Sequence, residues 1–113
     1  MSFSILFNIP SCPHCTTCRK SIIVIDSTTY NLLPMYELAG WWKEPSSVLS
    51  GTKTSALVPT LKAAIKDMKD RESVYRKLNP PNGWGNYEDA LQVTEQLLEA
   101  CVIHPDGFIE LSL

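Results

Sequence analysis

The chain has 113 residues, of which 44% are hydrophobic and 19% are charged, a composition that predicts one folded domain rather than a disordered chain. Its formal net charge is -2 and its sequence pI is about 5.6. Proteins that bind nucleic acid non-specifically carry an excess of positive charge. We therefore expect a single domain over residues 1–113 and no general nucleic-acid binding.

Hydrophobic runs in this sequence are short. None approaches the roughly 20 residues that span a bilayer, so a membrane is not an expected partner. The first ten residues contain no lysine or arginine before their apolar run, unlike a secretory signal. A cytoplasmic protein is expected, in which the four cysteines are thiols or metal ligands rather than disulfides.

The first two predicted elements are strands. Phe3, Ile5, Phe7 and Ile9 recur at every second position, which is the period of a half-buried strand over residues 2–9. Residues 22–26, IIVID, are short and rich in β-branched side chains, which favours a second strand. The two strands predict a hairpin with the segment CPHCTTC at or near its tip.

A short helix is predicted over residues 30–40, with Pro34 near its first turn and Gly40 as its stop. The next segment, WWKEPSSVLSGTKT, is rich in turn formers and reads as a loop. Because adjacent tryptophans in a loop are difficult to bury together, we expect Trp41 or Trp42 to be exposed. An exposed indole would serve a partner or a homo-oligomer interface.

Apolar residues then recur at spacings of three and four to about residue 69, which predicts an amphipathic helix. Thr54 or Ser55 is the expected N-cap, and Pro59 would lie within the opening turn. A shorter helix is predicted over residues 72–78, since the residue before a proline is pushed out of helical space.

The clearest apolar stripe runs over residues 87–102 and predicts a helix behind an Asn86 cap. Residues 108–113 alternate again and predict a closing strand. Together these elements predict an α+β fold in which the N-terminal hairpin and the C-terminal strand form a small antiparallel sheet. Three to four helices would pack on one face of that sheet.

Cysteines at intervals of three suggest a metal site in the hairpin tip. Cys12, Cys15 and Cys18 would supply three thiolate ligands for zinc, which needs a fourth ligand in a structural site. The fourth ligand would be one of three residues: His14, His104 or Cys101. The alternative is a well-formed turn without metal, with Cys101 as a small buried apolar side chain on the last helix.

The runs ILFNIPSCPHC and CTTCRK also resemble active-site segments of thioredoxin-fold and arsenate-reductase-like proteins, and VPT at residues 58–60 is similar to the cis-proline segment of that fold. The resemblance implies thiol redox chemistry, with the reactive cysteine at the start of a long helix. Here the motif is followed by SIIVIDSTT, which favours a strand, and VPT continues into a predicted helix.

The most unusual string is LNPPNGWGNYEDA, residues 78–90, in which Gly83 and Gly85 flank Trp84. Trp84 either packs under the last helix as part of the core or, with Asn82 and Tyr87, forms a stacking surface for a planar ligand such as a nucleotide. No nucleophile, base and orienting acid can be assembled from this sequence, and it has no phosphate-binding glycine motif. We therefore expect a protein that is not an enzyme.

From about residue 10 to the end, the chain resembles a family of small, largely uncharacterised proteins encoded by bacteriophages and prophages. The matching features are a CPxC turn near the amino terminus, the trio Tyr30, Asn31 and Met35, the string NPPNGWGNYE, and an alanine-cysteine followed by His-Pro in the tail, here Ala100, Cys101, His104 and Pro105. The family's turn reads CPxCG, whereas this chain has a threonine in the glycine position and an additional cysteine. The resemblance implies a protein that acts in a host cell, on a host factor or on a defence signal.

The expected function is that of a non-catalytic accessory protein that binds a small nucleotide-like ligand and so sequesters a host defence signal. Asn31 and Asn82 would supply polar contacts, and Trp84 and Tyr87 would form the walls. One alternative is an inhibitor that binds a host protein and has a structural zinc knuckle. The other is a thioredoxin-like or arsenate-reductase-like oxidoreductase. No cofactor other than zinc is expected.

Overall fold

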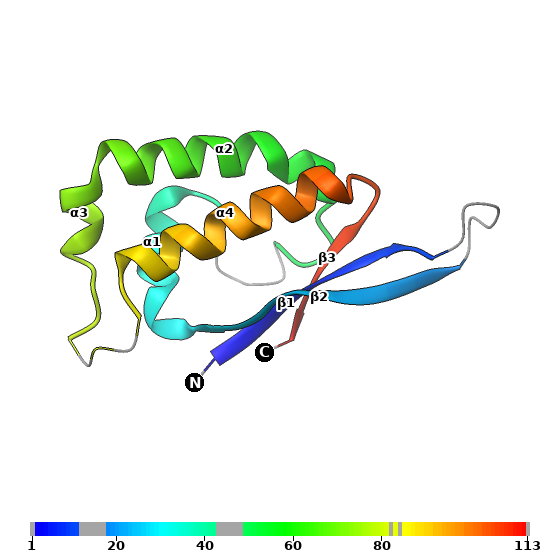
Figure 1. The fold of residues 1–113 in the computed structure, drawn as a ribbon, viewed down its shortest axis with the longest axis horizontal. Coiled ribbons are helices and arrows are strands. Elements are labelled where there is room, and N and C mark those ends of the chain that lie inside the picture. Colours follow the sequence, from blue (N-terminus) through cyan, green and yellow to red (C-terminus); the bar gives the residue numbers. More distant parts are fainter. Residues whose placement is uncertain (1, 12–17, 43–48, 82, 84, 113) are drawn as a thin grey trace.

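The structure is a computed structural model and describes residues 2–11, 18–42, 49–81, 83 and 85–112. Figure 1 shows the path of the chain. Its elements, in order, are β1 (Ser2–Pro10), β2 (Arg19–Thr29), a 3₁₀ helix (Tyr30–Leu32), α1 (Leu33–Ala39), α2 (Thr54–Asp70), α3 (Glu72–Arg76), α4 (Tyr87–Ile103) and β3 (Phe108–Ser112).

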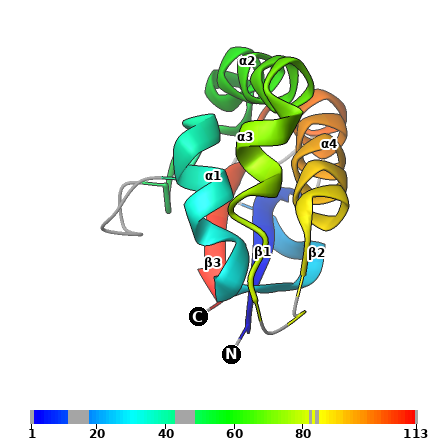
Figure 2. The same cartoon turned by 90° about the vertical axis from the view of Figure 1, so that its left-hand side faces the viewer.

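The strands form an antiparallel sheet with the order β2-β1-β3. Phe3, Ile5 and Phe7 of β1 are buried against the helices, which cover one face of the sheet (Figure 2). The other face carries polar contacts, such as the hydrogen bond from Asn8 Nδ2 to Glu110 Oε1 at 3.0 Å. This arrangement confirms the predicted α+β fold, with the hairpin and the closing strand in one sheet.

β2 is longer and less regular than the predicted strand over residues 22–26. Phe3 pairs with Thr28 but Ile5 pairs with Ile25, so β2 has one additional residue in that interval. A second additional residue follows, because Leu6 pairs with Ile23. Such bulges bend a strand and increase its twist. As a result, β2 does not simply alternate its side chains between the two faces after Ile23.

The start of α2 differs from the predicted cap. Lys53 is the N-cap residue, in an extended conformation that bridges to Phe108 of β3. The Thr54 hydroxyl donates to the His104 carbonyl and accepts the Gly107 N–H at 3.2 Å. Because these contacts join the helix start to the turn before β3, the helix begins early and Pro59 becomes its sixth residue rather than part of the opening turn.

The other helix ends agree closely with the predicted ones. Gly40 has a φ of 95° and its N–H donates to the carbonyls of Tyr36 and Glu37, which ends α1. Asn86 Oδ1 accepts the Asp89 N–H at 2.9 Å and so caps α4. In the described residues, no helix has both the length and the apolar character needed to cross a membrane.

The expectation that one of the adjacent tryptophans is exposed is wrong. Trp41 and Trp42 are each only 2% exposed. The Trp41 indole donates to Thr94 Oγ1 of α4 at 3.2 Å, and the Trp42 ring lies 5.0 Å from Phe3 of β1. The left-handed turn at Gly40 directs the chain so that both rings enter the core. The pair therefore gives no support to an oligomer interface.

Candidate functional site

A groove of about 680 Å³ lies between β2 and α4. Figures 1 and 2 show α4 above β2 at one side of the sheet. Residues 24–29 of β2 form one wall, and the opposite wall is formed by four residues of α4: Asp89, Gln92, Val93 and Gln96. A cavity of this size is in the range of binding sites for small-molecule ligands.

Local geometry explains why these residues line the groove. On α4 the four positions are spaced by three and four, so they share one face of the helix beside its buried stripe. In a regular strand only alternate residues of β2 would face the groove. The bulges beside Val24 and between Ile25 and Thr28 break that alternation, and six consecutive residues take part in the lining.

Glycines of the loop before α4 close one end of the groove. Gly83 and Gly85 both line it, with φ angles of 74° and 96°. A Cβ atom on Gly85 would lie 3.0 Å from Leu32 Cδ2 and 3.1 Å from Thr29 Cγ2. Gly85 therefore permits the loop to approach the 3₁₀ helix closely and in a conformation that side-chain-bearing residues avoid.

The groove has an acidic and hydrogen-bonding character. Asp26, Ser27, Asp89 and Gln92 are exposed, whereas the floor includes the buried Ile25 and Leu32. Among the described residues that line it, none is lysine, arginine or histidine. Carboxylates accept hydrogen bonds and attract cations. The groove suits a ligand rich in hydrogen-bond donors and disfavours phosphate groups.

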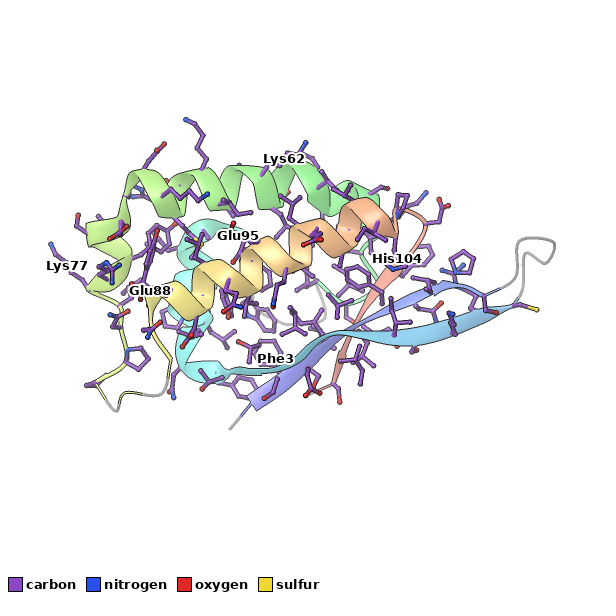
Figure 3. All side chains as sticks on the ribbon, in the orientation of Figure 1. Phe3, Lys62, Lys77, Glu88, Glu95 and His104 are labelled. Carbon is purple, nitrogen blue, oxygen red and sulfur yellow. The ribbon has the colours of Figure 1, made fainter. Side chains whose placement is uncertain are left out.

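A second cavity of about 300 Å³ continues the groove along the same two elements. It shares Val24 and Gln96 with the first cavity. Its β2 wall adds Ile22 and Ile23. The opposite wall adds three residues from the end of α4 and the residue after it: Glu99, Ala100, Ile103 and His104. We call the first cavity the acidic section and the second the apolar section. Figure 3 shows His104 at the C-terminal end of α4.

Two of the predicted ligand contacts, Asn31 and Tyr87, lie in the described residues, and neither lines the groove. Tyr87 is buried, and its hydroxyl donates to the Met68 carbonyl at 2.8 Å, so its ring lies in the core rather than in the groove. Asn31 is half-buried, its N–H donates to Thr29 Oγ1 at 3.2 Å, and it does not line the groove. Asn82 and Trp84 lie outside the described residues.

Two of the predicted zinc ligands, Cys12 and Cys15, also lie outside the described residues, as does His14. Cys18 is exposed and lies immediately before β2. Within the described part of the chain, no group of three or more His, Cys, Asp or Glu residues is placed to hold a metal ion. Zinc at the hairpin tip stays a prediction.

Cys101, the alternative fourth zinc ligand, and the segments that resemble a thioredoxin-type active site lie in other structural settings. Cys101 is fully buried on α4, and burial raises the pKa of its thiol to about 12. This agrees with the interpretation of Cys101 as a small apolar side chain. The cysteine segment leads into β2 rather than into a helix, and residues 58–60 lie inside α2. This arrangement differs from that of a thioredoxin-type active site.

Sequence reasoning did not identify Asp26, Asp89, Gln92 and Gln96 as site residues. The polar spacing on α4 is visible in the sequence, but so is the spacing of any solvated helix face. Asp26 lies on β2, and the approach of the α4 residues to it depends on contacts between segments about 60 residues apart in the chain. Compared with protein families, with curated proteins and with solved structures, the chain has no match.

Proposed function

We propose that this protein is a non-catalytic binding protein that holds an extended segment of a host protein in the groove between β2 and α4. The observation that carries the proposal is the shape of the site, a long groove between an edge strand and a helix. β2 has β1 as its only neighbour in the described sheet. Grooves beside an exposed strand edge are a recurring site for extended peptides.

The length of the groove supports a polypeptide ligand. Its two sections extend along α4 from Asp89 to Ile103. At a rise of 1.5 Å per helical residue, this span is about 21 Å. An extended chain advances about 3.3 Å per residue, so about six residues would occupy the whole groove. A single nucleotide would fill only one section of it.

A small nucleotide-like ligand is the second candidate. Gly83 and Gly85, on either side of Trp84, line the end of the acidic section. Asp26 and Asp89 could accept hydrogen bonds from base amino groups or ribose hydroxyls. Because these carboxylates repel phosphate, such a ligand would bind through its nucleoside, with its phosphates outside the groove.

Affinity purification from the host cells tests the proposal. We expect the tagged protein to retain a specific partner, and the double variant Asp26→Lys with Asp89→Lys to lose it. Glu37→Lys reverses the charge of one exposed carboxylate on α1, outside the groove, and should retain the partner.

The same preparation decides between the two ligand classes. Heat denaturation followed by mass spectrometry of the released small molecules identifies a bound nucleotide. If the wild type and the double variant retain the same proteins and the same small molecules, the groove is not the binding site and the proposal is wrong.

A further inference from the structure

This inference rests on the proposed function and names the chemistry of the partner segment. We infer that the groove selects an extended segment that carries a basic side chain and, four or five residues away, an apolar side chain. The basic side chain would lie in the acidic section and the apolar one in the apolar section. The inference follows from the charge, the exposure and the spacing of the two sections.

Charge identifies the occupant of the acidic section. Asp26 and Asp89 line this section, and Glu99 lies further along the groove. Within the described residues none of these carboxylates takes part in an ion pair. Among the lining residues that the structure describes, His104, at the far end, is the only one with a basic side chain. In the acidic section, a lysine or arginine of a partner would therefore meet the carboxylates of Asp26 and Asp89 and no fixed cation among the described lining residues.

Exposed aliphatic side chains identify the occupant of the apolar section. Ile23 and Ile103 are each 62% exposed, although they lie beside the half-buried Ile22 and Ala100. Burying an exposed isoleucine side chain against another apolar surface lowers the free energy of the complex. An incoming leucine, isoleucine or valine would cover both isoleucines at once and would remain beside the acidic section.

The distance between the two sections predicts how many residues separate the basic and the apolar side chain in the partner segment. From Asp89 to Ala100, α4 rises by about 16 Å. From Ile22 to Asp26, β2 advances by about 13 Å. An extended chain covers these distances in about four to five residues. The groove itself does not distinguish the two chain directions, so both orders of the basic and apolar residues belong in the test.

The edge of β2 contributes main-chain hydrogen bonds only beside the apolar section. From Arg19 to Ile23, β2 pairs with β1 in unbroken register, so its outer edge is regular there. Bulges interrupt the strand beside the acidic section, and a bulged edge resists strand addition. The apolar end of the segment would therefore bind as an added strand, and the basic end through side chains.

Fluorescence anisotropy with labelled peptides of about nine residues tests the inference. The probe contains one leucine and one lysine four residues apart, in both orders, in a background of serine and threonine. We expect binding that weakens about tenfold when the lysine becomes glutamate, when the leucine becomes serine or when the separation is reduced to one residue. Higher salt should weaken the binding of the lysine peptide.

Variants of the protein assign the two contacts. Asp26→Asn with Asp89→Asn should remove the preference for lysine over glutamate, and Ile103→Ser should remove the preference for leucine over serine. Glu37→Gln should leave both preferences unchanged. Circular dichroism confirms that each variant folds.

Three results would overturn the inference. In the first, the peptides bind equally or do not bind, while the host partner still depends on Asp26 and Asp89, which would leave the proposed function intact. In the second, adenosine binds to the acidic section more tightly than any peptide. In the third, Ile103→Ser abolishes a concentration-dependent dimer in sedimentation, which would assign the apolar section to a second copy of the chain.

Discussion

Replacing Tyr87 with phenylalanine tests the position of this residue most directly. The sequence predicts a ligand contact for Tyr87, whereas the structure buries it and uses its hydroxyl as a donor to the Met68 carbonyl at 2.8 Å. Met68 lies in the last turn of α2, where carbonyls lack partners within the helix. Burial raises the pKa of Tyr87, so the hydroxyl stays protonated as a donor at neutral pH. We expect Tyr87→Phe to lower stability without affecting ligand binding.

The size of the loss follows from the buried carbonyl. A buried acceptor that loses its partner costs about 1–3 kcal/mol. For 113 residues the entropy of unfolding is about 0.24 kcal/mol/K, so a loss of 1.5 kcal/mol lowers the Tm by about 6 °C. A Tm shift of this size exceeds the effect expected from the small change in ring polarity alone, so it would report the lost hydrogen bond.

Urea unfolding followed by tryptophan fluorescence measures this loss, since Trp41 and Trp42 are buried in the folded state. Tyr30→Phe is the matched control. Tyr30 is half-buried, and its hydroxyl makes no hydrogen bond within the described residues. Equal stability of the two variants would refute the assigned hydrogen bond. Loss of partner binding in Tyr87→Phe, with unchanged stability, would support a ligand contact for Tyr87, as the sequence predicts.

The remaining predictions concern the glycine loop, the buried thiol and the α2–α3 corner. Gly85→Ala should cost about 1 kcal/mol more than Gly83→Ala, because both residues have positive φ but only at Gly85 would the new Cβ meet neighbouring side chains; equal losses in thermal unfolding would contradict this contact. Because its pKa is raised to about 12, Cys101 should not react with Ellman's reagent at pH 8 when the other cysteines are replaced by serine; rapid reaction of the folded protein would contradict its burial. Hydrogen bonds from Arg71 and Tyr75 hold the pKa of Asp67 below its ordinary value of 3.8. Because the folded pKa lies below the unfolded one, this stabilisation is present above the unfolded pKa and is lost as the pH falls through the folded pKa. The stability difference between wild type and Asp67→Asn should therefore shrink in acid, and a difference independent of pH in urea titrations would contradict the contact.

Much of the fold could be predicted because its signals are local. The alternation of Phe3, Ile5 and Phe7 reflects burial of one face of β1, and the apolar stripe of α4 reflects burial of one side of that helix. Gly40 and Asn86 end and begin helices through hydrogen bonds to residues within four positions. Such features depend on neighbours along the chain, so a single sequence contains them.

Other features depended on contacts that no local pattern records. Thr54 is a plausible N-cap by type, but its hydroxyl contacts the turn before β3 instead. The sequence places Trp41 and Trp42 in a loop, and only their contacts with Thr94 of α4 and Phe3 of β1 show that both indoles lie in the core. In each case the position of the side chain depends on a contact with a distant part of the chain rather than on its neighbours in the sequence.

The sequence by itself determined one antiparallel sheet with helices on one face, since periods of two and of about 3.6 residues state which side of each element must be buried. Only the tertiary structure decided the groove. Its walls come from β2 and from α4, and bulges in β2 turn consecutive residues of the strand toward it. A bulge is set by the pairing of two strands and a groove by the packing of two elements, so neither has a signature within one segment of the sequence.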